Sequence, residues 1–252
     1  MGGNIQIYKK KDKNNKLNNY LSKINYQFKK NINLKYKLNI TNTNDDIGGN
    51  DIFEVFISYK DNKEYLVSPN FETHNLDIYL LLDNKNILSL KGHITNIFSI
   101  RYFINNKDYN EYLISADKNK KVIIWDITNN YNIKYKINTK YEANIYSCLM
   151  IFPHNSNDNY IITSTWNTSN DFDKSSTKIY LLNNGKFLKY INNTHINEIF
   201  YLLSWYNKKN DKYYVIQLSS NKILIHNAIE EELYSEFIQE PEDDHFSGFI
   251  YK

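Results

Sequence analysis

Short runs of apolar and aromatic residues, separated by polar turns, recur along the chain from residue 51 onward. Each run has about five to eight residues, is rich in Ile, Val, Tyr and Phe, and is bounded by Asn, Asp, Lys or Gly. Branched and aromatic side chains fit the half-buried surface of a sheet better than they fit a helix. The pattern therefore predicts an all-β fold.

Three phrases of the sequence repeat in a common register. The first is an acidic or amide residue followed by Ile and an aromatic residue, at 51–53, 96–98, 144–146 and 198–200. The second begins at 64, 111, 159 and 213, and the third ends at Tyr79, Trp125, Tyr180 and His226. Phrases that stay in step over intervals of this length indicate repeated structural units.

Each repeat has room for four strands joined by short polar turns. In the second repeat we predict these strands at 96–104, 111–116, 121–127 and 132–138. Four antiparallel strands in a repeat of about 45 to 50 residues is the arithmetic of a β-propeller blade. The predicted units are approximately 51–93, 94–142, 143–195 and 196–245, followed by a partial unit at 246–252.

The second repeat resembles the WD-repeat (transducin β-like) propeller family. It carries Gly92-His93 before its first strand and Trp125-Asp126 at the end of its third strand. The family has a hydrogen-bonded structural tetrad, and matching positions here are His93, Ser115, Asn119 and Trp125. Asn119 stands where the family has Asp, and its amide oxygen can still accept a bond from the histidine ring.

The two ends of the chain look like incomplete repeats. Residues 5–8 resemble the third phrase, and 245–251 resemble the opening of a further unit. Two interpretations stay open: the ends complete one blade and close a small ring, or the chain is part of a longer propeller. Seven blades of about 45 residues would need over 300 residues, which favours the fragment.

The family resemblance implies a non-catalytic scaffold that binds a peptide or a domain of another protein on one face of the propeller. That face is built from two sets of turns: those between the second and third strands, and those that enter the first strands. The candidate interaction residues are His74, Asn75, Lys118, Trp166, Asn167 and Asp171. Trp166 is the foremost of these, because an aromatic residue in a polar loop is typical of an interface anchor.

Charge adds an alternative function. The chain has 31 basic and 28 acidic residues and a net charge of +3, which by itself gives no reason to expect nucleic acid as a partner. Residues 1–40, however, carry ten lysines against the single acid Asp12, and we separate this basic segment from the propeller at 41–252. The alternative is association with nucleic acid or an anionic membrane surface through that segment.

Nothing in the sequence indicates catalysis. The six histidines lack the close spacing of zinc sites, and there is no glycine-rich phosphate loop, so we expect no metal, no cofactor and no enzyme activity. Cys148 is the only cysteine, which favours a reducing compartment, the cytoplasm or the nucleus. No apolar run approaches the roughly 20 residues of a transmembrane helix.

Overall fold

The computed structural model describes residues 53–83, 85–105, 107–139, 144–153, 156–166, 177–191, 199–219, 222–230 and 233–238. Side chains within these ranges are described except those of 144, 166, 200 and 234–238. The chain divides into two compact units, and all described residues belong to the unit Asn50–Asp244. The predicted basic segment at 1–40, its boundary with the propeller and the two partial terminal repeats lie outside the described residues.

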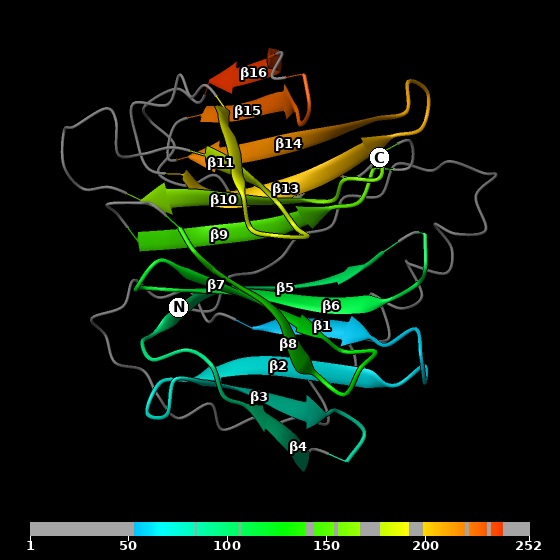
Figure 1. Cartoon of the computed structure of the whole chain (residues 1–252), viewed down its shortest axis with the longest axis vertical. Helices are drawn as coiled ribbons and strands as arrows, with labels where there is room; N and C mark the ends of the chain where they lie inside the picture. Colours follow the sequence, from blue (N-terminus) through cyan, green and yellow to red (C-terminus); the bar gives the residue numbers. More distant parts are fainter. Residues whose placement is uncertain are drawn as a thin grey trace. The chain divides into compact units, whose positions relative to one another are not determined.

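The described residues form sixteen strands and no helix, as the sequence pattern predicts for an all-β chain. They make four sheets of four strands (Figure 1). The first sheet contains β1 (Glu54–Ile57), β2 (Glu64–Asn70), β3 (Asn75–Leu80) and β4 (Lys85–Leu90). The second contains β5 (Ile97–Ile104), β6 (Glu111–Asp117), β7 (Lys121–Asp126) and β8 (Asn132–Asn138). The third contains β9 (Asn144–Ile151), β10 (Tyr160–Trp166), β11 (Thr177–Leu181) and β12 (Phe187–Ile191), and the fourth contains β13 (Ile199–Asn207), β14 (Lys212–Ser219), β15 (Lys222–Asn227) and β16 (Leu233–Ile238).

Within each sheet the strands are antiparallel and lie in chain order. The four strands predicted for the second repeat agree with β5 to β8 to within one residue at each end. The second and third strands of a sheet are its interior strands, and in β6 all seven residues are buried. The fourth strand is an edge, so β8 alternates between exposed and more buried positions.

Successive sheets pack face to face through three apolar cores. One core joins the first and second sheets, another joins the second and third, and a further one joins the third and fourth. Leu113 of β6 faces the first of these cores, whereas its neighbours Tyr112 and Ile114 face the second. Because both faces of the second sheet are covered, its interior strands are apolar on both sides and lack the usual alternation.

A β-bulge recurs at one position of every sheet. In each pairing of the third strand with the fourth, the register shifts just before the residue that ends the third sequence phrase. The shifts fall between Ile78 and Tyr79, Ile124 and Trp125, Ile179 and Tyr180, and Ile225 and His226. Since a bulge re-aims the side chain beside it, the sheets are equivalent in local geometry as well as in strand number.

The first strands of successive sheets are tied together by hydrogen bonds of one kind, and the two bonds to serine lie at equivalent positions. In each case a side chain of one first strand accepts a bond from a backbone N–H of the next first strand. The bonds are Cys148 N to Ser99 Oγ (3.1 Å), Leu202 N to Ser147 Oγ (3.0 Å) and Tyr102 N to Glu54 Oε1 (3.1 Å). The strands β1, β5, β9 and β13 therefore lie along one line of contact between the sheets.

Candidate interaction surface

The turns that leave the second strands lie on one side of the four sheets. We call this side the second-strand end, because the C-terminal ends of the second strands lie there. The strands β2, β6, β10 and β14 all run toward the left of Figure 1. A buried contact shows that the first two sheets share this orientation. Ser58 lies in the turn between β1 and β2, away from the second-strand end, and its hydroxyl donates to Glu111 at the N-terminal end of β6. Of the residues predicted to bind a partner, His74, Asn75, Lys118 and the backbone of Trp166 belong to this end.

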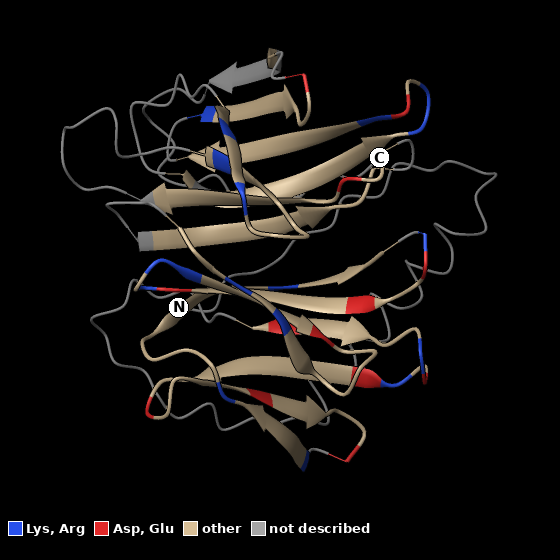
Figure 2. Cartoon of the chain, in the orientation of Figure 1, with Lys and Arg blue, Asp and Glu red and all other residues tan. Residues whose placement is uncertain are grey.

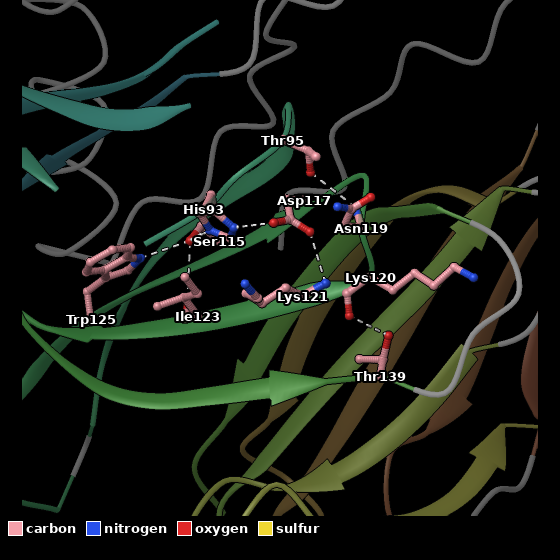
Figure 3. Close-up of polar contacts among 10 residues, drawn as sticks. All are labelled: His93, Thr95, Ser115, Asp117, Asn119, Lys120, Lys121, Ile123, Trp125 and Thr139. Atoms are coloured by element: carbon pink, nitrogen blue, oxygen red, sulfur yellow. Dashed lines mark hydrogen bonds and ion pairs between the residues drawn. The ribbon is translucent and has the colours of Figure 1, made fainter. Parts of the chain in front are cut away.

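At the second-strand end of the second sheet, four side chains form a buried hydrogen-bonded chain (Figure 3). Nδ1 of His93 lies 2.8 Å from Oδ2 of Asp117, and Nε2 of His93 lies 2.7 Å from Oγ of Ser115. The indole N–H of Trp125 donates to the same Ser115 oxygen at 2.9 Å. These residues come from β6, from β7 and from the segment that precedes β5.

The partners of His93 assign its proton. The Asp117 carboxylate can only accept, so Nδ1 of His93 donates to it, and Nε2 forms the second hydrogen bond, with the Ser115 hydroxyl. This arrangement satisfies every polar group of the chain of bonds while all four side chains are buried. Its structural effect is to hold His93 firmly against the end of β6.

The prediction that Asn119 is the fourth member of this group is wrong. Asn119 is exposed, and the histidine's acceptor is Asp117, two residues earlier at the end of β6. The expectation followed the turn position of the family's Asp, whereas the side chain that reaches inward from this strand is Asp117. His93, Ser115 and Trp125 are joined by hydrogen bonds as the resemblance implied.

Gly92 allows the segment before β5 to approach the sheet closely. A Cβ atom at this position would lie 2.9 Å from Cδ1 of Ile123 and 2.9 Å from Cη2 of Trp125. Real Cβ atoms essentially never come so close to other heavy atoms. A larger residue here would have to displace Ile123 and the Trp125 ring, and glycine avoids this where the chain passes over the ring into His93.

Two backbone contacts fix the turn between β6 and β7 against the same segment. Lys118 N donates to Asn96 O at 2.9 Å, and Asn119 N donates to Oγ1 of Thr95 at 3.3 Å. Both contacts use main-chain groups of the turn, so the exposed side chains of Lys118 and Asn119 are not engaged by them. The predicted interaction residue Lys118 is thus presented to solvent from an anchored backbone.

His74 and Asn75 occupy the corresponding turn of the first sheet. The backbone of His74 is left-handed, with φ of 58°, and its N–H donates to Asn70 O at 2.8 Å. Both side chains are half-buried. They lie at the predicted end of the sheet but offer less surface than Lys118.

The third sheet carries the remaining predicted residues. Trp166 is the last residue of β10 and pairs with Asn144, which places its backbone at the second-strand end. Its side chain, together with Asn167 and Asp171, lies outside the described residues. Their role in binding stays a prediction.

Aromatic residues at the first-strand bulges form a further part of this end that was not predicted from the sequence. In β5 and β9 the register shift skips Phe98 and Tyr146, and these rings stack with centroids 4.9 Å apart and planes at 7°. Both are half-buried and lie near the N-terminal ends of their strands, at the second-strand end. The signal was present, since each is the aromatic residue of the repeated first phrase, but it was interpreted only as strand composition.

The opposite end of the first two sheets is held by a buried carboxylate. Glu111 is 1% exposed, and its oxygens accept bonds from Tyr59 N (2.6 Å), Tyr102 Oη (2.6 Å) and Ser58 Oγ (3.0 Å). Three donors from two sheets satisfy this carboxylate without a counter-charge. It is a joint between sheets, and its oxygens are occupied by the protein itself.

A second charged group lies where the first strands meet. Nη1 of Arg101 is 3.6 Å from Oε2 of Glu54, and its guanidinium carbon lies 4.3 Å from the centroid of the Tyr201 ring. Burial raises the pKa of Glu54, and the positive charge of Arg101 only partly opposes this effect. Arg101 of the second sheet therefore contacts both the first and the fourth.

Neither the cysteine nor a group of metal-binding side chains indicates thiolate or metal chemistry in the described part of the chain. Cys148 is fully buried, and desolvation raises the pKa of its thiol to about 12, so the nucleophilic thiolate is disfavoured. Among the described residues, no three His, Cys, Asp or Glu side chains are grouped to hold a metal ion. This part of the chain also contains no helix with the length and hydrophobicity needed to cross a bilayer.

Comparison with known proteins assigns no family. Neither a protein-family model nor a curated protein matches this chain.

Proposed function

We propose that this chain is a non-catalytic scaffold of the WD-repeat propeller type, which binds other proteins at the second-strand end. The observation that carries the proposal is an exposed isoleucine on an immobilised segment. Ile94 is 64% exposed, although the chain on both sides of it is fixed by His93 and Thr95. Because the backbone at Ile94 is already fixed, little backbone entropy is lost when a partner covers this apolar side chain.

The four equivalent sheets support the architectural part of the proposal. Their inter-sheet hydrogen bonds and repeated bulges resemble successive blades, and the buried group around His93 agrees with the WD-type resemblance in three of its four members. Ring closure and total blade number depend on residues outside the described ranges. An intracellular, reducing location remains our expectation from the lone, buried Cys148.

The experiment is an affinity capture with three matched baits from extracts of the cells that express the protein. The baits are the wild-type chain, Ile94→Glu at the second-strand end, and Leu82→Glu in the turn between β3 and β4 at the opposite end. Leu82 is 79% exposed, so its replacement controls for adding a charge at an exposed apolar site. Thermal melts establish that all three baits are equally folded.

We expect a set of proteins captured by the wild type and by Leu82→Glu, and lost with Ile94→Glu. Identical capture by all three baits would contradict binding at the second-strand end. Capture that disappears only when residues 1–40 are deleted would favour the alternative function, association through the basic segment. Salt-sensitive recovery of RNA or lipid with that segment would distinguish the alternative directly.

A further inference from the structure

The surface around Ile94 is basic as well as apolar. Segments 91–96 and 117–121 contact one another through the His93, Thr95 and Asn96 hydrogen bonds. Together they contain four lysines, Lys91, Lys118, Lys120 and Lys121, of which the first two are exposed. We call Lys91, Ile94 and Lys118 the Ile94 patch. Figure 2 shows lysines gathered at the turn between β6 and β7.

The acidic residue of these two segments does not neutralise the patch at its surface. Asp117 is the only acid in 91–96 and 117–121, and it is fully buried. Its two oxygens are taken by His93 and by the backbone N–H of Lys121. Within these two segments, the charges exposed to solvent are therefore those of Lys91 and Lys118.

The turn that carries the lysines is held in a conformation that its residues do not favour. Lys120 has φ of 66°, in the left-handed region where Gly, Asn and Asp are the usual residues. Three hydrogen bonds over-determine this backbone: Lys120 N donates to Asp117 O, and Lys120 O accepts from both the N–H and the hydroxyl of Thr139. These bonds anchor the turn that carries Lys118.

We infer that the Ile94 patch binds an acidic segment of the partner protein. An apolar side chain of that segment packs on Ile94, while its carboxylates pair with Lys91 and Lys118. The inference rests on the proposed function and adds the chemistry of the partner. Complementary charge around an apolar anchor aligns the bound segment and raises the association rate, and burial of the anchor supplies most of the affinity.

The test uses a phage-displayed library of random 12-residue peptides, selected on the immobilised full chain. Enriched peptides are synthesised with a fluorescent label, and their affinities are measured by anisotropy. We expect peptides with net negative charge and at least one large apolar residue. For these, Lys91→Glu with Lys118→Glu should weaken binding by about ten-fold or more, with a loss that shrinks as salt is raised.

Matched controls separate this effect from unfolding and from general charge. Lys60→Glu with Lys63→Glu reverses two lysines in the turn between β1 and β2, at the opposite end, and should leave the affinity nearly unchanged. Ile94→Ser removes the anchor without adding charge and should also weaken binding. Thermal melts show whether each variant remains folded.

The alternative outcomes are distinguishable. Neutral or basic peptides whose binding is lost with Ile94→Ser would overturn the acidic partner but leave the proposed function intact. Failure to enrich any peptide that depends on the patch would overturn the inference, and the three-bait capture would then judge the function separately. Binding of a labelled 12-nucleotide RNA to the patch, without enrichment of acidic peptides, would also overturn it.

Discussion

Nδ1 of His93 lies 2.8 Å from Oδ2 of Asp117, and both side chains are almost completely buried. Removing the acceptor should leave the histidine N–H without a partner in the interior. We expect Asp117→Ala to lower the free energy of unfolding by about 1–3 kcal/mol, the range for a buried donor left unsatisfied. Urea denaturation followed by tryptophan fluorescence measures this change.

Asn119→Ala is the matched control for that variant. Its side chain is exposed, and only its backbone N–H contacts Thr95, so we expect a change within about 0.5 kcal/mol. A larger loss with Asn119→Ala than with Asp117→Ala would show that the assignment of Asp117 to the buried group is incorrect.

Glu111 and Glu64 start equivalent strands of successive sheets but have different environments. Glu111 is buried and accepts three hydrogen bonds, whereas Glu64 is exposed. Glu111→Ala should therefore cost more than about 3 kcal/mol of unfolding free energy, and Glu64→Ala less than about 0.5 kcal/mol. Equal effects in chemical denaturation would argue against the joint between the first two sheets.

His226 should make stability depend on pH. It is buried, burial lowers its pKa below the usual 6.5, and neither ring nitrogen has a hydrogen-bond partner among the described residues. Below about pH 6.5 the unfolded chain binds a proton that the folded chain does not, so this contribution to stability is present above pH 6.5 and is lost as pH falls through the folded pKa.

The measurement compares wild type with His226→Leu in urea at pH 7.5 and pH 5.5. The wild type should lose more stability between these two values than the variant does. A variant with the same pH dependence as the wild type would mean that His226 is not the titrating group.

The two serine bonds between first strands can be tested separately, because Ser99 and Ser147 occupy equivalent positions in successive sheets. Ser99→Ala and Ser147→Ala each remove the acceptor of a buried backbone N–H, and each should cost about 1–2 kcal/mol of unfolding free energy. Ser204→Ala, at an exposed position of β13, should have almost no effect. If only one of the two buried serines matters, the bonds are not equivalent joints.

Much of the fold followed from the sequence because repetition averages out weak local signals. Aligning the three repeated phrases predicts the strands of the second repeat. The same alignment places Tyr79, Tyr180 and His226 at the position of Trp125. The pairings of Leu66 with Tyr79 and of Leu113 with Trp125 show that this alignment places residues in equivalent ladder positions.

The details of the site were harder to predict because they depend on which way a side chain points at the end of a strand. The family's turn position indicates Asn119, whereas the acceptor is Asp117, which still belongs to the strand and faces inward. The stacking of Phe98 on Tyr146 depends on a bulge in each strand, and composition alone does not reveal an added residue. The joint at Glu111 depends on how two sheets pack. Glu64 and Glu111 begin the same repeated phrase, so the alignment of the repeats does not show that only Glu111 is buried.

Photo-crosslinking from position 94 tests the central claim most directly. A benzoylphenylalanine residue is placed at Ile94 in one chain and at Leu82 in another, and each is irradiated in extracts of the cells that express the protein. We predict a discrete protein adduct from position 94 that an excess of the selected acidic peptide suppresses, and no such adduct from position 82. Adducts from position 82 alone, or adducts from position 94 that the peptide does not affect, would contradict an acidic protein partner at the second-strand end.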